Sequence, residues 1–159
     1  MSKIKTLEEI QEIAKELKKQ GKTIVTTNGS FDITHIGHIK FLQEAKEQGD
    51  VLIVGLNSDV SIKKYKSKDR PIIKQGHRAD TLAALSCVDY IVIMDEAEIA
   101  APLIRTVKPD VHVNGTEYGE NCVEAKAIQE VGARLHLIPI YKGFSTTSLI
   151  NRILEIYKK

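Results

Sequence analysis

Five short apolar runs, separated by segments of helical character, constrain the fold of this chain more than any other feature. Each run is continuously apolar or β-branched, without a regular alternation of polar residues. Strands of this kind are buried on both faces, which is typical of a parallel sheet covered by helices. The runs occupy residues 23–27, 50–57, 88–94, 109–115 and 133–140.

The segments around these runs carry apolar residues at helical spacing. We expect helices over residues 6–20, 37–48, 58–65, 76–86, 96–107, 122–132 and 145–159. Thr6 and Glu9 fit a capping box, and Gly21 and Gly132 are natural stops. Pro102 limits the helix over 96–107 to a late start or a kink.

Strands and helices thus alternate along the whole chain. This order predicts a Rossmann-like α/β fold, a doubly wound five-stranded parallel sheet with helices on both faces. The length of 159 residues suits one domain, with an N-terminal helix in residues 1–21 and an α/β core in residues 22–159.

Composition narrows the functional classes. The formal net charge is only +2, so there is no global attraction to nucleic acid or to a membrane surface. The two cysteines, Cys87 and Cys122, form no CxxC pair and are expected to be reduced thiols. The apolar runs are too short to span a bilayer, and the N-terminus is charged. We therefore expect a cytoplasmic protein without nucleic-acid or membrane partners.

Polar and glycine-rich segments follow four of the five predicted strands. They read TNGSFDITHIGH, NSD with a lysine run, NGTEYG and YKGFSTT. Because ligands of such sheets bind beyond the carboxyl ends of the strands, these segments are expected to form one site. His112 and His136 fall within strands and are expected in the core or at the sheet edge.

His35 and His38 lie three residues apart at a helix start, so both are expected on one face. Gly37 leaves the backbone bare, and the helix terminus offers N–H donors. Two imidazoles at such a terminus suit a phosphate that loses a leaving group. A metal site needs a third ligand, which the neighbouring sequence lacks, so no metal site is predicted. Simple helix capping by both histidines is the remaining alternative.

The segment GSFDITHIGH resembles the signature of the cytidylyltransferase-like nucleotidyltransferase superfamily, Gly/Thr-x-Phe-Asp-x-x-His-x-Gly-His. The resemblance extends over residues 5–157, through GHRADTLAALSCVDYIV, KPDVHVNGTEYG and GFSTTSLI. Within the superfamily these segments are most similar to the adenylyltransferase half of bifunctional heptose kinase/adenylyltransferases, which also occurs free-standing.

The resemblance implies that a sugar phosphate attacks the α-phosphate of ATP and that pyrophosphate leaves in line. His35 and His38 would stabilise the transition state, and Mg²⁺ would arrive with ATP, held by phosphates and water. Asp32 would fix the loop, help to hold the metal or contact substrate. Nucleotide binding would fall to the first glycine loop and the helix start, at Asn28, Gly29, Ser30, Phe31 and Gly37.

The lysine run and the third helix carry further candidates from the same resemblance. A lysine of this run reaches the phosphates in related proteins, and Lys66 is the best match, with Lys64 second. A solvated basic loop is the alternative. Arg78 would reach the β- and γ-phosphates, unless it is an ordinary helix arginine. Asn57 and Asp59 end the second strand and are candidates for contact with the sugar phosphate.

The last two segments are expected to bind the nucleotide. Ser145, Thr146 and Thr147 open the final helix, where hydroxyl and N–H groups suit an anion, although Ser145 also fits a plain N-cap. Asn114, Gly115 and Tyr118 would close over base and ribose. Related proteins often have Gly-Gly-Asp-Tyr in this region, and Cys at the position of Ser30, so the base preference is less constrained.

The resemblance therefore implies an adenylyltransferase that makes ADP-heptose and pyrophosphate from ATP and D-glycero-β-D-manno-heptose 1-phosphate. A homodimer is expected, as is common among relatives, and a separate kinase would supply the sugar phosphate. Two alternatives stay open, a glycerol-3-phosphate cytidylyltransferase and a non-catalytic nucleotide-binding module.

Overall fold

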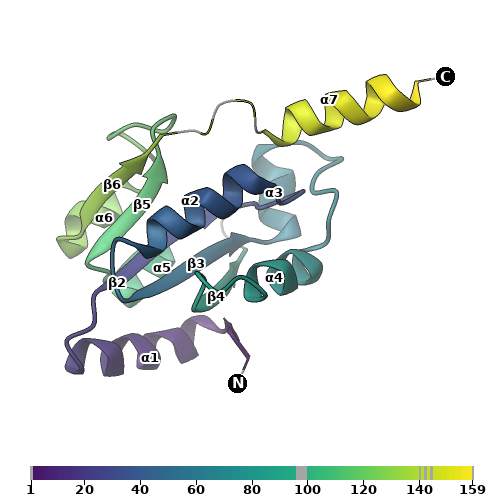
Figure 1. Ribbon diagram of the computed structural model, residues 1–159. Coiled ribbons are helices and arrows are strands. Elements are labelled where there is room, and N and C mark those ends of the chain that lie inside the picture. The colour runs from purple at the N-terminus through teal and green to yellow at the C-terminus, as the bar shows by residue number, and fades with distance from the viewer. Residues whose placement is uncertain (1, 96–99, 140, 142, 144, 159) are drawn as a thin grey trace.

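A six-stranded parallel sheet organises the protein (Figure 1). The computed structural model describes residues 2–95, 100–139, 141, 143 and 145–158. The strand order is β1-β4-β3-β2-β5-β6, and every neighbouring pair is parallel. The strands are β1 (Ile4–Lys5), β2 (Ile24–Gly29), β3 (Val51–Asn57), β4 (Tyr90–Met94), β5 (Val111–Gly115) and β6 (Arg134–Ile138).

All five predicted strands are confirmed, but the predicted number of strands was wrong. The sixth strand is β1, in which Ile4 and Lys5 pair with Ile91 and Val92 of β4. Two residues are too few for a periodic pattern, so only the tertiary contact reveals this edge strand. The last expected strand residue, Ile140, lies outside the described residues.

Seven helices among the described residues follow the predicted order. They are α1 (Leu7–Lys19), α2 (Ile36–Lys46), α3 (Asp59–Tyr65), α4 (Gln75–Ala83), α5 (Ala101–Val107), α6 (Ala125–Val131) and α7 (Thr146–Tyr157). Thr6 and Glu9 form the predicted capping box, and Gly132 ends α6 with φ at 72°. Pro102 lies in the first turn of α5, which confirms the late start. Residues 96–99 and 159, predicted as helical, lie outside the described part of the chain.

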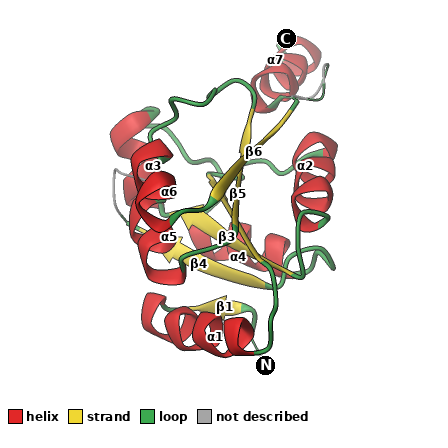
Figure 2. Cartoon of the chain, turned by 90° about the vertical axis from the view of Figure 1, so that its left-hand side faces the viewer, coloured by secondary structure: helices red, strands yellow, loops and turns green. Residues whose placement is uncertain are grey.

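Helices cover both faces of the sheet (Figure 2). One face packs against α1 and α5, where Ile10 and Leu103 meet Ile53. The other face packs against α2 and α4, where Leu42 and Leu82 belong to the second cluster of buried apolar side chains. This double coverage explains why the strands are apolar on both faces.

Helix α7 stands apart from these layers. It buries none of its residues; Figure 1 shows it extending beyond the sheet toward the C-terminus, and Figure 2 shows it above the other helices. Over the described residues, no helix combines the length and the apolar character that crossing a membrane requires.

The chain order reverses at β2, which has β3 on one side and β5 on the other. The β2–β5 ladder pairs Val25 with Val111 and Thr26 with His112. His112 is fully buried there, with its Nδ1 2.9 Å from the hydroxyl of Thr26, which confirms its expected place in the core. Reversal points of this kind form the ligand crevice in open α/β sheets.

Candidate active site

Two adjoining cavities lie at the carboxyl ends of β2 and β5. The larger has a volume of about 260 Å³ and the smaller of about 170 Å³. Both are lined by His38, Phe41, Gly115 and Glu117, so they meet along this line of residues. The larger is further lined by His35, Gly37, Ile138, Pro139, Tyr141, Ser145 and Thr146. The smaller is further lined by Asn28, Gly29, Ser30, Phe31, Lys66, Asn114 and Tyr118.

The two histidines cap helix α2 reciprocally. The backbone N–H of Gly37 donates to Nδ1 of His35 at 3.1 Å, and the backbone N–H of His35 donates to Nδ1 of His38 at 3.3 Å. Their ring centroids are 3.9 Å apart. Because each Nδ1 accepts a hydrogen bond, the proton of each neutral ring is assigned to Nε2. The predicted capping and the predicted placement at one cavity therefore occur together.

The environment keeps these imidazoles neutral. Burial lowers the pKa of His35 below its usual value. Burial, followed by the proximity of His35 and Lys66, lowers the pKa of His38 to about 4. At neutral pH each ring can thus donate through Nε2 without carrying a charge of its own.

The loop before α2 has a backbone that few sequences adopt. Phe31 and Ile33 have positive φ angles of 45° and 52°, which is unusual for a large and for a β-branched residue. A Cβ atom on Gly29 would approach the ring of Phe31 to 3.0 Å, so the glycine makes room for the buried aromatic ring. Such conformations persist only where surrounding contacts fix them, and they cluster at functional sites.

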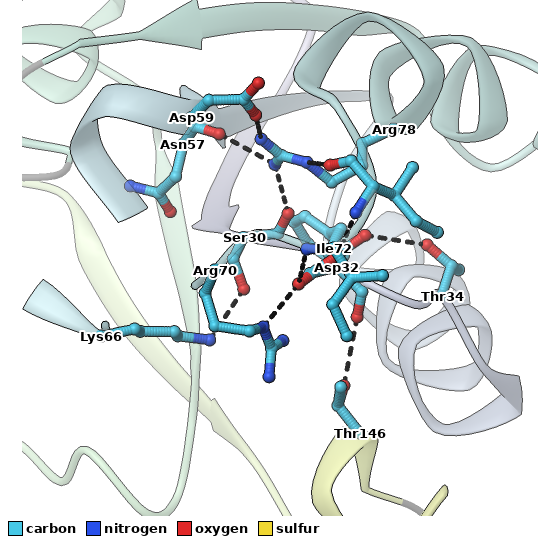
Figure 3. A network of polar contacts seen from close by, with 12 residues as sticks. Ser30, Asp32, Thr34, Asn57, Asp59, Lys66, Arg70, Ile72, Arg78 and Thr146 are labelled. Atoms are coloured by element: carbon cyan, nitrogen blue, oxygen red, sulfur yellow. Dashed lines mark hydrogen bonds and ion pairs between the residues drawn. The ribbon is translucent and has the colours of Figure 1, made fainter. Parts of the chain in front are cut away.

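Asp32 supplies those contacts (Figure 3). Its buried carboxylate accepts hydrogen bonds from the backbone N–H groups of Ile72 and Ile73 and from Nε of Arg70. Burial alone would raise the pKa of Asp32, but these donors lower it on balance. Its backbone carbonyl also accepts from the hydroxyl of Thr146 at 3.1 Å. Asp32 thereby ties the histidine loop to the basic loop and to the start of α7.

Lys66 reaches the smaller cavity from the end of α3. Its Nζ donates to the hydroxyl of Ser30 at 2.9 Å. Desolvation of the ammonium, followed by the positive charge of Arg70, lowers the pKa of Lys66. A cation is therefore held against Ser30 of the histidine loop, at the smaller cavity. Lys64 is exposed and does not line either cavity.

Arg78 is buried and lines neither cavity. Its side chain is 1% exposed and donates to the backbone carbonyls of Ser30, Asn57 and Ile73. It also forms an ion pair with Asp59 at 2.8 Å (Figure 3). With these partners, Arg78 holds the ends of β2 and β3 together, and its contact with a phosphate stays a prediction.

Most of the predicted site residues do converge on the two cavities. The exceptions among the described residues are Asp32, Asn57, Asp59, Lys64, Arg78 and Thr147. Asn57 is buried and donates to Ser61, while Thr147 is exposed on α7. Their proposed ligand contacts remain predictions.

Two acidic residues near the cavities were missed by the sequence analysis. The carboxylate of Glu117 lies directly over Gly115, where a Cβ atom would be 2.0 Å from its Oε2. Its position just after the fourth predicted strand was the available signal. Glu124 is 3% exposed and accepts hydrogen bonds from the side chains of Asn28 and Asn114. No sequence pattern marks that carboxylate as buried.

A resident metal does not fit the residues present. Within the described residues, no group of three or more His, Cys, Asp or Glu side chains is arranged to hold a metal ion. Both carboxylate oxygens of Asp32 are already engaged by the protein. Any Mg²⁺ would accordingly be held mainly by oxygens of the nucleotide and of water.

The cytidylyltransferase-like family model matches residues 26–152, a span that contains most of β2, both histidines, Lys66 and the start of α7. The chain belongs to the cytidylyltransferase-like family. This membership confirms the resemblance seen in the sequence and makes the chain a nucleotidyltransferase by family.

Similar proteins include two that are named bifunctional protein HldE. The one from Nitratiruptor sp. is 51% identical over 151 residues, which cover 94% of this chain and 32% of that protein. The one from Syntrophotalea carbinolica is 44% identical over 159 residues, which cover 99% of this chain and 32% of that protein. The chain thus spans about a third of the length of these curated relatives.

Solved structures show the same fold. A lipopolysaccharide core biosynthesis protein from Thermoplasma volcanium is 28% identical with a TM-score of 0.61, covering 78% of this chain and all of that one. A pantoate-beta-alanine ligase from Francisella tularensis has a TM-score of 0.67 at 16% identity and covers 100% of this chain and 80% of that one. The second likeness supports the fold alone.

Proposed function

We propose that this protein transfers an adenylyl group from ATP to D-glycero-β-D-manno-heptose 1-phosphate, releasing pyrophosphate and forming ADP-heptose. The observation that carries the reaction class is the pair of neutral imidazoles that line the larger cavity, where neither Nε2–H has a hydrogen-bond partner among the described residues. The heptose is supported by the similarity to the proteins named HldE.

In this proposal a phosphate oxygen of the sugar phosphate forms a bond to the α-phosphorus of ATP. The bond from that phosphorus to the bridging oxygen breaks, and pyrophosphate carries the electron pair away. The chain's own groups contribute positioning and charge stabilisation. His35 and His38 donate through Nε2 to the α-phosphate oxygens, on which negative charge accumulates.

Lys66 adds a positive charge at the smaller cavity, which His38 also lines. Its ammonium donates to the hydroxyl of Ser30. It can exchange this neutral acceptor for a phosphate oxygen, which is a stronger hydrogen-bond acceptor because it is charged. Ser145 and Thr146 open α7 at the larger cavity, where their hydroxyl and N–H groups suit the remaining phosphates. Mg²⁺ bound with ATP would neutralise part of the triphosphate charge.

The test is pyrophosphate release from a panel of nucleotides and acceptors. We expect turnover with ATP and the heptose 1-phosphate, dependent on both substrates. Turnover with CTP and glycerol 3-phosphate instead would replace this assignment by the cytidylyltransferase alternative. Nucleotide binding without turnover of any pair would indicate a binding module. The expected homodimer and the cytoplasmic location are also proposals, which sedimentation and cell fractionation can test.

A further inference from the structure

Glu124 is a buried carboxylate that the nucleotidyl-transfer chemistry does not use. It is 3% exposed and immediately precedes α6, yet its side chain makes no capping hydrogen bond to that helix. None of the ion pairs among the described residues involves it. Burying a carboxylate without a cation costs free energy unless hydrogen bonds compensate for the loss of water. The donors that surround Glu124 therefore bear on its role at the site.

Two of the hydrogen-bond donors to Glu124 come from the two strands that flank the crevice, and the thiol of the buried Cys122 is also hydrogen-bonded to its side chain. Oε1 accepts from Nδ2 of Asn28 on β2 at 3.0 Å, and Oε2 accepts from Nδ2 of Asn114 on β5 at 3.3 Å. The last residues paired between β2 and β5 are Thr26 and His112. Asn28 and Asn114 lie two residues further on, where these two strands no longer pair with each other, and the carboxylate bridges them there.

Both asparagines also line the smaller cavity, together with Lys66 and Tyr118. Because each carboxylate oxygen accepts from an amide nitrogen, Glu124 turns the NH₂ group of each asparagine toward itself. The carbonyl oxygens are oriented as a result. Oδ1 of Asn114 accepts from the N–H of Gly115 at 3.0 Å, and Oδ1 of Asn28 has no partner among the described residues.

Glu124 also ends the segment that carries Glu117 and Tyr118 over the cavities. That segment leaves β5 at Gly115, where Asn114 holds it, and Glu124 holds its other end. We propose that Glu124 is a positioning residue for the nucleotide pocket, which acts by fixing Asn28 and Asn114 at the separation and orientation that binding requires. This assignment rests on the proposed function for the identity of the ligand.

The Glu124→Gln variant separates this role from simple folding. Glutamine has nearly the same shape, and its carbonyl oxygen can still accept from Asn114. Its amide nitrogen would face Asn28, whose amide can flip to offer the free Oδ1. The fold is therefore expected to survive, with the orientation of Asn28 reversed. Glu120→Gln is the matched control, because Glu120 is exposed in the same segment.

The measurement is calorimetric titration with ATP, and separately with CTP, in the absence of any acceptor. We expect Glu124→Gln to weaken binding of the preferred nucleotide about tenfold, as loss of a hydrogen bond to a charged group does. Glu120→Gln should bind like the wild type. Adding Glu124→Gln to Asn28→Ala should weaken binding by much less than tenfold, since Glu124 acts through Asn28.

Several outcomes would overturn the assignment. Binding by Glu124→Gln within twofold of the wild type is one, and full additivity with Asn28→Ala is another. If Glu124→Gln fails to fold, Glu124→Asp decides, because it keeps the charge but is too short to reach both asparagines. Wild-type affinity in that variant would refute the role. Wild-type protein that binds ATP but turns over no acceptor would refute the proposed function alone.

Discussion

The backbone N–H of His35 donates to the ring of His38, 3.3 Å away, while the ring of His35 accepts from Gly37. Nδ1 of each imidazole therefore accepts a hydrogen bond at the start of α2, and Nε2 is left as the donor that we propose for the substrate. This division sets the tautomers without help from a carboxylate. It also means that a substitution can be chosen to remove one of the two tasks.

The His38→Asn variant should lose catalysis and keep the helix start. Its amide oxygen can accept from the N–H of His35, but it has no donor at the place of Nε2. We expect kcat to fall about 100-fold or more, as for other preorganised donors at a developing charge. The same loss is expected for His38→Ala, with an additional loss of stability of about 1 kcal/mol from the missing cap.

Steady-state kinetics with saturating ATP, and chemical denaturation of both variants, check this prediction. His77→Gln is a suitable control because His77 is exposed on α4, away from both cavities. Full activity of His38→Asn would contradict the role of Nε2–H.

Stability should decline as the solution is acidified below about pH 6.5. The pKa values of His38 and His112 are lowered, mainly by burial, to about 4 and about 3. In the unfolded chain both histidines take up protons near pH 6.5, so between that pH and about 4 the unfolded state binds more protons. The free energy of unfolding then falls by about 1.4 kcal/mol per pH unit for each histidine.

Urea denaturation between pH 7 and pH 5 measures this slope. His112→Asn removes one of the two groups and should make the slope clearly shallower than that of the wild type. An identical slope in His112→Asn and wild type would show that burial of His112 does not contribute to the pH dependence.

Lys66→Ala should reduce kcat/KM by about 100-fold, because the ammonium beside Ser30 is the cation placed at the cavity by the basic loop. Lys63→Ala removes an equal charge from an exposed position of α3 and should change kcat/KM by less than about threefold, mainly through screened long-range attraction. Equal losses in the two variants would mean that only the net charge of the loop matters.

Arg78→Ala should first of all destabilise the fold. The guanidinium satisfies three backbone carbonyls and pairs with Asp59, and its removal leaves those buried acceptors without donors. We expect a loss of about 3 kcal/mol or more in the free energy of unfolding. A variant of unchanged stability with a raised KM for ATP would support the original phosphate-binding prediction instead.

The sequence predicts the order of elements well because the information is local. Helix starts at Thr6 and Ser145, the stop at Gly132 and the late start at Pro102 each depend on a few neighbouring residues. The edge strand at Ile4 was missed because its partner in β4, Ile91, lies far away along the chain.

The site was predictable in type but not in detail. The motif places His35, His38 and Gly37 at a helix start, and the structure has them there. The inward turn of Arg78 and the burial of Glu124 depend on partners far away in sequence, such as Ser30 and Asn28. Local composition does not distinguish a buried arginine that binds carbonyls from an exposed one that binds phosphate.

The separation of α7 from the core has a consequence for measurement. Ser145 and Thr146 line the larger cavity, but the helix that they open buries no side chain, and the hydroxyl of Thr146 is tied to Asp32. Amide hydrogens of α7 should then exchange through local opening, long before those of β2 and β3. A nucleotide bound to the first turn of α7 would slow this exchange, and a tighter-binding nucleotide would slow it more. Deuterium uptake in this peripheral helix would therefore report whether the central crevice is occupied.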